Sequence, residues 1–221
     1  TGCGSKESEL TFDKIKCLKF LKNKGIKTAK SISVKKNTEI KSEKIQKEIG
    51  FPCFIKASKS GSSFGVYKVY NQEEFIDCLN SAFEIDDEIL VETFIEGREF
   101  SIGVLTYKNK VTVLPITEII ASNDFFDYEA KYEGKSQEIT PAKIDDKLKD
   151  KLNKISKDIY NIIGLKGFSR SEFIVNKDGI YFLETNTVPG LTSESILPQQ
   201  AQHAGISLED LFVNSIYEVI K

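Results

Sequence analysis

Four polar residues in the last third of the sequence have the types and spacing to hold a divalent cation. Arg170 and Glu172 precede two apolar runs joined by the turn-forming run 176–179, and Glu184 and Asn186 follow them, a pattern that predicts an antiparallel hairpin. If the last three residues of that turn form the loop, Glu172 lies opposite Glu184 and Arg170 lies opposite Asn186. Because alternate side chains of a strand point to the same face, all four are expected on one face of the hairpin.

The two carboxylates create an electrostatic conflict that a metal ion would resolve. Directly opposed glutamates repel each other, and Ile174 and Phe182, expected on the same face, limit screening by water. A carboxylate pair with a neutral amide oxygen is a ligand set suited to Mg²⁺, which keeps its remaining positions for water and phosphate oxygens. The alternative at this point is a hairpin with a solvated polar face and a register shifted by one residue.

Length and composition indicate a globular chain with one large or two small domains. The 221 residues are 40% hydrophobic, which supports a packed core, and the formal net charge is -2. Lysine and arginine are spread along the chain, which argues against nucleic acid or an anionic membrane as a partner. No apolar run approaches the roughly 20 residues that span a bilayer.

The cysteines and the start of the chain carry two further expectations. The four cysteines, at positions 3, 17, 53 and 78, lack metal-ligand spacing and favour reduced thiols in the cytoplasm. Because the sequence begins at Thr1 and contains no methionine, we expect further sequence before it.

Periodicity predicts the elements that must position the polar residues. Helices are expected at 11–24, 42–49, 71–83, 145–163, 195–204 and 208–220. Strands are expected at 52–57, 66–70, 88–93, 100–107, 111–120 and on both sides of the hairpin turn. The aromatic and charged segment 124–141 is expected to be a loop, either a functional lid or disordered, and His203 is expected on the surface.

A loop rich in glycine and serine, residues 58–65, follows the strand that ends near Lys56. Its backbone N–H groups and hydroxyls could cradle a phosphate, with the Lys56 ammonium adding positive charge. The loop lacks the Walker pattern, and an ordinary hairpin loop is the alternative.

Seven sequence blocks occur together in an order that resembles the D-alanine:D-alanine ligases of the ATP-grasp superfamily. They are Asp13-Lys14, Ile55-Lys56, the loop Gly61 to Gly65, Glu92 to Glu99, Asp127 to Tyr132, Arg170 to Glu172, and Glu184 to Ser195. The resemblance implies an α+β, ATP-grasp fold in which two subdomains, residues 1–92 and 93–221, grip a nucleotide between them.

The resemblance assigns the nucleotide contacts. Lys14 and Lys56 would grip the ATP phosphates, with the loop that contains Ser63 closing over them, and Glu99 would hold the ribose hydroxyls. The adenine hinge would be Glu92, Thr93, Phe94 and Ile95, and Phe125 and Lys131 would complete the nucleotide site. Phe126 stands where many relatives carry tyrosine, so one hydroxyl contact is expected to be absent.

The resemblance also assigns the metal ligands, in agreement with the hairpin. Glu172, Glu184 and Asn186 would bind two Mg²⁺ ions, for which Mn²⁺ could substitute. The first of these residues is aspartate in the familiar ligases, so Glu172 adds a methylene to the coordination arm.

The implied reaction has two steps. ATP phosphorylates the carboxylate of one D-alanine, and the amine of a second D-alanine attacks the resulting acyl phosphate. Arg170 and the Gly190 N–H would hold the oxyanion, Lys131 would contact the transferred phosphate, and Ser195 would bind the carboxylate of the second substrate. A hydrogen bond between Ser62 and Tyr132 would lock the lid and keep water from the intermediate.

The resemblance sets the biological expectations and leaves alternatives. The product would be D-alanyl-D-alanine for peptidoglycan precursors, hence for cell-wall biogenesis and cell shape, made in the cytoplasm from D-alanine and ATP by a full-length homodimer. A preceding domain, absent from this sequence, would position the first D-alanine, so this chain alone is expected to bind MgATP with little or no turnover. The alternatives are D-serine or another amino or hydroxy acid as substrate, a nucleotide-binding fragment without activity, and a ligand-free α+β domain.

Overall fold

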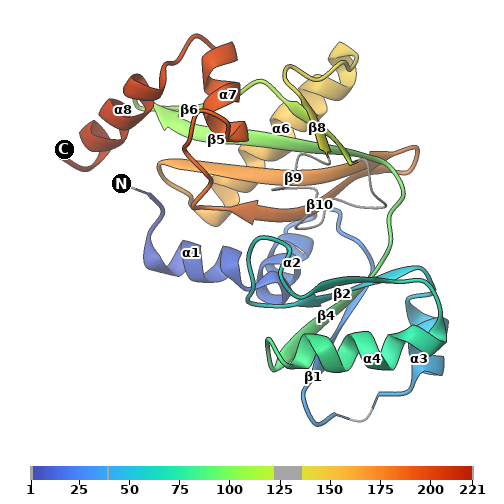
Figure 1. The fold of residues 1–221 in the computed structure, drawn as a ribbon. Helices are drawn as coiled ribbons and strands as arrows, with labels where there is room; N and C mark the ends of the chain where they lie inside the picture. Colours follow the sequence, from blue (N-terminus) through green and yellow to red (C-terminus); the bar gives the residue numbers. More distant parts are fainter. Residues whose placement is uncertain (1, 39, 122–135, 221) are drawn as a thin grey trace.

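The computed structural model describes residues 2–38, 40–121 and 136–220. Within these residues the chain forms two antiparallel sheets, one above the other in Figure 1, with the first two helices beside the large sheet and facing the small one. No helix of these ranges combines the length and apolar character needed to cross a lipid bilayer.

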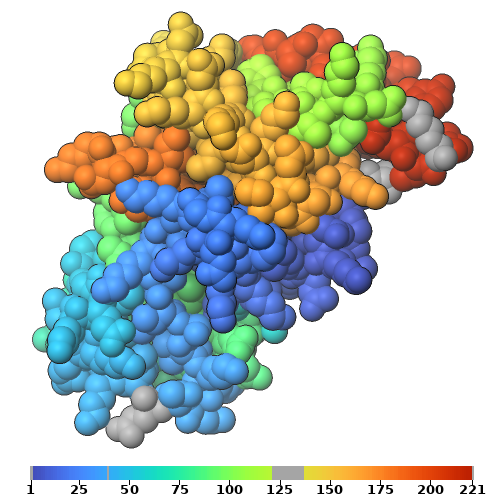
Figure 2. Space-filling view, turned by 180° about the vertical axis from the view of Figure 1, so that it is seen from behind, coloured from blue at the N-terminus to red at the C-terminus, as the bar shows by residue number. Residues whose placement is uncertain are grey.

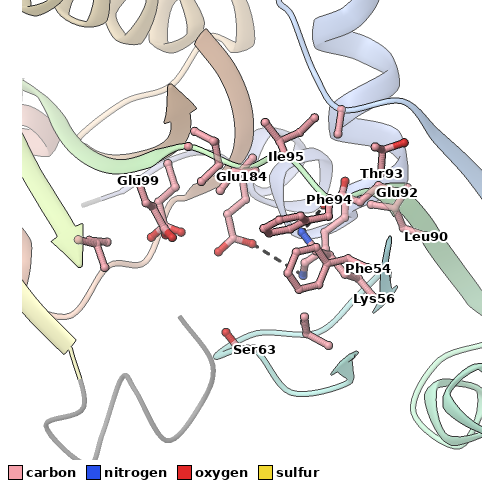
Figure 3. Close-up of a pocket in the computed structure, with 18 of the residues that line it drawn as sticks. Phe54, Lys56, Ser63, Leu90, Glu92, Thr93, Phe94, Ile95, Glu99 and Glu184 are labelled. Carbon is pink, nitrogen blue, oxygen red and sulfur yellow. Dashed lines mark ion pairs between the residues drawn. The ribbon is translucent and has the colours of Figure 1, made fainter. Parts of the chain in front are cut away.

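The small sheet has the strand order β1-β4-β2-β3. Its strands are β1 (Ser31–Lys35), β2 (Cys53–Ala57), β3 (Val66–Val69) and β4 (Glu88–Thr93). Period-two alternation along β2 buries Cys53, Ile55 and Ala57 in a core, which they share with residues of helices α3 (Ser42–Glu48) and α4 (Gln72–Phe83). Phe54 and Lys56 therefore point to the opposite face, toward the large sheet (Figure 3).

The large sheet has the order β10-β9-β5-β7-β8, with β6 also paired to β5. Its strands are β5 (Arg98–Tyr107), β6 (Lys110–Val113), β7 (Thr117–Ala121), β8 (Ser136–Ile139), β9 (Phe168–Asn176) and β10 (Gly179–Asn186). Phe100, Phe173 and Phe182 pack in one core with helix α6 (Asp146–Ile163). On the other face, Leu105 packs with helices α7 (Ile196–His203) and α8 (Leu208–Ile220).

The two helices that begin the chain lie against the last hairpin. Helices α1 (Ser5–Phe12) and α2 (Lys14–Asn23) contact β10, and Thr28 forms an isolated bridge with Phe182. Seen from behind, the blue N-terminal segment lies between the orange hairpin region and the cyan region of the small sheet with helices α3 and α4, here called the small unit (Figure 2). A single helix over 11–24 was therefore a wrong prediction, because Asp13 is extended and caps α2 by accepting a hydrogen bond from the Lys16 N–H.

Most predicted elements are confirmed, and the exceptions have physical reasons. The helices predicted at 42–49, 71–83, 145–163, 195–204 and 208–220 are present. The edge strand β1 was missed because only Val34 of its five residues is buried, so it lacks an apolar pattern. The predicted strand 111–120 is two strands, β6 and β7, and the last part of the predicted loop 124–141 forms β8.

The metal-site hairpin has the predicted register at Glu172–Glu184 and Arg170–Asn186, but it reaches that register differently. Gly179 pairs with Asn176, and a β-bulge lies between Phe182 and Glu184. The bulge places Phe182 opposite Phe173 in the core, with ring centroids 5.9 Å apart. The expectation that Phe182 shares the polar face was therefore wrong.

Candidate active site

A cavity of about 550 Å³ lies between the two sheets and is lined by residues of both. In Figure 3, Lys56, Phe54 and Ser63 approach it from the small sheet and its loop, and Glu99 and Glu184 approach it from the large sheet. These side chains come from strands whose other face is packed in a core. Both walls of the cavity therefore carry charged side chains on strands that are held by a core behind them.

Lys56 forms a shielded ion pair with Glu92 across the small sheet. Lys56 lies on β2 and Glu92 on β4, and the ammonium contacts the carboxylate directly. Burial acts to lower the pKa of Lys56, but the carboxylate of Glu92, helped by Glu184 and Glu99, raises it above its ordinary value. Lys56 is therefore held as a cation that faces the cavity.

The Gly/Ser loop has a backbone suited to an anion. Ser62 and Ser63 both have positive φ, 52° and 56°, so the loop turns sharply at the cavity wall. Ser58 anchors the loop, because its hydroxyl donates to Asp13 Oδ1 at 2.9 Å and its carbonyl accepts from the Lys14 N–H at 3.0 Å. The Lys14 ammonium donates to the Ser60 carbonyl and so lies at the same loop.

The connection between the sheets provides an aromatic end to the cavity. Phe94 lies 5.9 Å from Phe54 between ring centroids, and the Lys68 ammonium lies 4.1 Å above the Phe94 ring. The Phe94 N–H already donates to the Pro52 carbonyl at 3.3 Å, and the Thr93 N–H donates to Lys30. A base bound here would therefore use other groups of the predicted hinge.

Glu172 and Glu184 both line the cavity, opposite each other on β9 and β10. Glu172 is 4% exposed and accepts a hydrogen bond from Arg170 at 2.9 Å, and Glu184 lies 4.0 Å from the Lys14 ammonium. Asn186 follows Glu184 on the same face of β10, and its Oδ1 accepts from the Val188 N–H at 2.9 Å. A carbonyl oxygen has a second lone pair, so that bond leaves one for a cation.

Arg170 has a buried donor that the described residues do not satisfy. Its Nε is buried and has no hydrogen-bond partner among the described residues. A buried guanidinium N–H without a partner is costly in a protein interior, and an anionic ligand would satisfy it.

Gly190 and Ser195 meet in the segment that follows β10. A Cβ on Gly190 would lie 2.6 Å from Ser195 Oγ and 3.3 Å from its Cβ, so the glycine leaves room for the serine hydroxyl in this position. Ser195 caps the N-terminal end of α7 in extended conformation, and its hydroxyl lies 2.9 Å from the Thr192 hydroxyl. The structure thus brings the two predicted residues together.

Four predicted site residues lie outside the part of the chain that the structure describes. They are Phe125, Phe126, Lys131 and Tyr132. The predicted contact of Ser62 with Tyr132 therefore stays a prediction.

Sequence reasoning missed part of the apolar lining and the acidic residues Glu118 and Glu138. Leu90 and Leu183 line the cavity without having been predicted there, and period-two alternation from Glu92 could have found Leu90, whereas Ile174 lines it as expected. Glu138 on β8 was missed because it lies in the segment predicted to be a loop. Burial raises the pKa of Glu138, with Arg170 opposing and Glu172 adding to the effect, so its carboxyl faces the same charged region.

Comparison with solved structures defines the class of protein. The structure of the VanG D-Ala:D-Ser ligase from Enterococcus faecalis superposes with a TM-score of 0.86 and 34% identity, over 97% of this chain and 63% of that one. The D-alanine–D-alanine ligase of Bacillus anthracis complexed with ATP superposes with a TM-score of 0.84 and 29% identity, over 98% of this chain and 68% of that one. Two α+β units around a charged cavity, with these neighbours, are the ATP-grasp fold of ATP-dependent ligases.

Sequence comparison defines the family within that class. A family model described as "D-ala D-ala ligase C-terminus" matches residues 20–217. The D-alanine–D-alanine ligase of Flavobacterium johnsoniae is 53% identical over 98% of this chain and 67% of its own length, and that of Christiangramia forsetii is 50% identical over 98% and 66%. The chain belongs to the D-alanine–D-alanine ligase family, and it spans about two thirds of the length of these relatives.

Proposed function

We propose that the chain is the ATP- and metal-binding part of an enzyme that joins two D-alanine molecules through an acyl phosphate. One observation carries the proposal: the opposed carboxylates Glu172 and Glu184 form one wall of a cavity whose other wall holds Lys56 and the Gly/Ser loop. A nucleoside triphosphate requires cations and backbone N–H groups on one side of its phosphates and metal ligands on the other.

ATP is proposed to lie with its base near Phe54 and Phe94 and its phosphates at the Gly/Ser loop. Lys14, Lys56 and Ser63 would hold the phosphates, and Glu99 the ribose. Glu92, Thr93, Phe94 and Ile95 would surround the base, with Phe125 and Lys131 completing the site. The gripping subdomains are proposed as residues 1–92 and 93–221, with α1 and α2 the part of the first that lies against the second.

The residues present fit Mg²⁺. Glu172, Glu184 and Asn186 offer two carboxylates and an amide oxygen on one face of the hairpin. Bound Mg²⁺, one or two ions, would neutralise charge on the phosphate oxygens during transfer.

The residues beyond the metal ligands are proposed to hold the amino-acid substrates. Arg170 has a buried N–H with no partner in the described part of the chain, which suits the oxyanion that forms when the amine attacks the acyl phosphate. The Gly190 N–H would share that oxyanion, and Ser195 would bind the carboxylate of the second substrate. Lys131 would contact the transferred phosphate, and Ser62 with Tyr132 would close the site against water.

D-Serine is the second candidate for the attacking substrate. The observation that favours it is the likeness of this chain to the VanG D-Ala:D-Ser ligase, at 34% identity. Comparing rates with D-serine and with D-alanine as the second substrate separates the two candidates. We further propose that the product serves peptidoglycan precursor synthesis in the cytoplasm and that the full-length enzyme is a homodimer.

The metal-dependent grip is tested by calorimetric titration of this chain with a non-hydrolysable ATP analogue, with and without Mg²⁺. We expect the wild-type chain to bind the analogue only when Mg²⁺ is present. In Glu184→Gln we expect the affinity to fall by at least roughly tenfold and to depend no longer on Mg²⁺. The control is Glu73→Gln, on the exposed first turn of α4, which should bind like the wild type.

Two outcomes would contradict the proposal. Mg²⁺-dependent binding that persists unchanged in Glu184→Gln would remove Glu184 from the metal site. An absence of binding by both this chain and the full-length ligase would exclude the cavity as a nucleotide site.

A further inference from the structure

Strand β5 changes its partner in the middle of the large sheet. Residues 99–101 pair with β7, and residues 104–107 pair with β6. Strand β6 ends at Val113 and strand β7 begins only at Thr117. The sheet therefore has a gap beside β5 near Gly103. Gaps of this kind leave backbone groups without strand partners, and such groups are costly when buried.

The side-chain amide of Gln200, from α7, fills this gap. Its Oε1 accepts from the Gly103 N–H at 2.9 Å, and its Nε2 donates to the Ser101 carbonyl at 2.8 Å. One donor and one acceptor on the same strand are the pair that a neighbouring peptide group would satisfy. Gln200 therefore takes the place of a strand residue in the sheet.

The fit around this amide is close and complete. Gln200 is fully buried, and a Cβ on Gly103 would lie 2.6 Å from its Oε1, so the glycine provides the space that the amide occupies. Nε2 also donates to the Thr117 hydroxyl at 2.9 Å, which lies 2.6 Å from the Thr140 hydroxyl. The network thus joins α7 to β5, to β7 and to the residue that follows β8.

Gln200 lies less than two turns from the proposed site of the second substrate. Helix α7 begins at Ile196, directly after Ser195, and the Gln199 N–H donates to the Ser195 carbonyl at 3.2 Å. A rotation or slide of this short helix would carry the Ser195 hydroxyl with it. The orientation of α7 therefore determines where that hydroxyl lies relative to Gly190 and Arg170.

The apolar contacts of α7 cannot fix that orientation as sharply. Leu197 and Ala201 are fully buried, but apolar packing is non-directional and tolerates small rotations. Hydrogen bonds to an amide weaken steeply when their angle changes. The three bonds of Gln200 thus define both the rotation of α7 and its position along the sheet.

We infer that Gln200 is a positioning residue that holds Ser195 in place for the carboxylate of the second amino-acid substrate. The inference rests on the proposed function, because it uses the role assigned there to Ser195. It concerns the second substrate alone. The three hydrogen-bond partners of Gln200 that the structure shows, Gly103, Ser101 and Thr117, do not line the cavity proposed for the nucleotide.

The test uses the full-length ligase and measures the KM for each substrate. In Gln200→Met, which keeps the length and approximate volume of the side chain, we expect the KM for the second D-alanine to rise roughly tenfold and the KM for ATP to stay within about twofold. The matched control is Gln202→Leu, on the exposed face of the same helix, with no expected change in either KM. If Gln200→Met does not fold, Thr117→Val removes one acceptor of the network and should give the same pattern with a smaller rise.

The outcomes distinguish this inference from the proposed function. A folded Gln200→Met enzyme with an unchanged KM for the second D-alanine, or with equal rises in both KM values, overturns the positioning role. Ser195→Ala, measured in parallel, tests the proposed function itself: an unchanged KM for the second D-alanine in that variant would remove Ser195 from the substrate site, whatever Gln200 does.

Discussion

At the residue scale, Lys56 and Glu92 combine a structural and a functional role in one ion pair. Both side chains are largely buried, at 17% and 6% exposure. Removing one partner of a buried pair leaves an uncompensated charge, and replacing both with apolar residues can be nearly neutral. Single and double substitutions of this pair can therefore separate the contribution of Lys56 to folding stability from its contribution to nucleotide binding.

We expect Lys56→Met to lower the free energy of unfolding by about 3 kcal/mol and to abolish nucleotide binding. The double variant Lys56→Met with Glu92→Leu should recover most of the stability and none of the binding, because the phosphates still lack their cation. Urea denaturation and calorimetric titration measure the two quantities. Recovery of nucleotide binding in the double variant would show that Lys56 does not contact the phosphates.

Asp13 makes the stability of the N-terminal helices depend on pH. Burial acts to raise its pKa, but hydrogen bonds from the Lys16 N–H and the Ser58 hydroxyl, with the Lys16 ammonium, lower it below the ordinary value of 3.8. A carboxyl whose pKa is lower in the folded state stabilises the fold above its unfolded pKa and loses that contribution as pH falls through the folded value.

Asp13→Asn keeps a capping side chain and removes the charge, so we expect it to cost about 1 kcal/mol near neutral pH. The difference from the wild type should shrink as the pH falls below about 4 and disappear at lower pH. Urea unfolding curves of both proteins at several pH values measure it. A difference that stays constant with pH would show that the charge contributes nothing.

At the element scale, the bulge in β10 adds apolar surface to the cavity and keeps the two glutamates opposite each other. Phe182 pairs with Phe173 and Glu184 pairs with Glu172, which are consecutive positions on β9, so Leu183 is the extra residue. A strand without Leu183 would pair regularly and keep Glu184 opposite Glu172. The bulge therefore places Leu183 on the cavity wall.

Deleting Leu183 should weaken binding of the ATP analogue by roughly fivefold, because the lost apolar contact is worth about 1 kcal/mol of binding free energy. The Mg²⁺ requirement should remain, because the register of the carboxylates is unchanged. The substitution Leu183→Ala, which keeps the bulge, is the comparison and should weaken binding by a similar factor. Loss of the Mg²⁺ requirement in the deletion alone would show that the bulge positions Glu184.

Local patterns predicted most elements, and the exceptions have both local and long-range causes. The capped helix after Asn71 and the amphipathic helix ended by Gly164 follow from signals within a few residues, and both are present. The break between β6 and β7 contains Pro115, a local signal that was overlooked, and only the filling of the gap by Gln200 is long-range. The bulge at Leu183 similarly depends on burying two phenylalanines in one core.

The parts of the site that lie on one hairpin could be predicted from the charge and spacing of its residues. The opposed glutamates of the hairpin follow from a turn and period-two alternation, and the structure brings them together. Which lysines, aromatic residues and loop face them depends on how the two sheets are placed, and spacing along the chain does not encode that. The resemblance to the ligase family supplied this part, and the cavity gathers Lys14, Lys56 and Ser63 opposite the glutamates as it implied.

At the scale of the whole molecule, the core of the large sheet is built from both ends of the chain. Cys17, Leu18 and Leu21 of α2 pack in the same core as Phe173 and Phe182 of the last hairpin. The small sheet, residues 31–93, lies between these partners in the sequence. In space, the small unit is thus an insertion into the large one.

This arrangement has a consequence for how the chain acquires its structure. During synthesis, α2 leaves the ribosome long before the hairpin that buries its apolar face, whereas every strand and helix of the small unit is complete by Thr93. The small unit can therefore form while the chain is still growing. The large core must wait for β10, and its formation closes a loop of more than a hundred residues. Such non-local contacts slow folding. Until then, the apolar face of α2 lacks its partners from the hairpin and is open to contact with a chaperone.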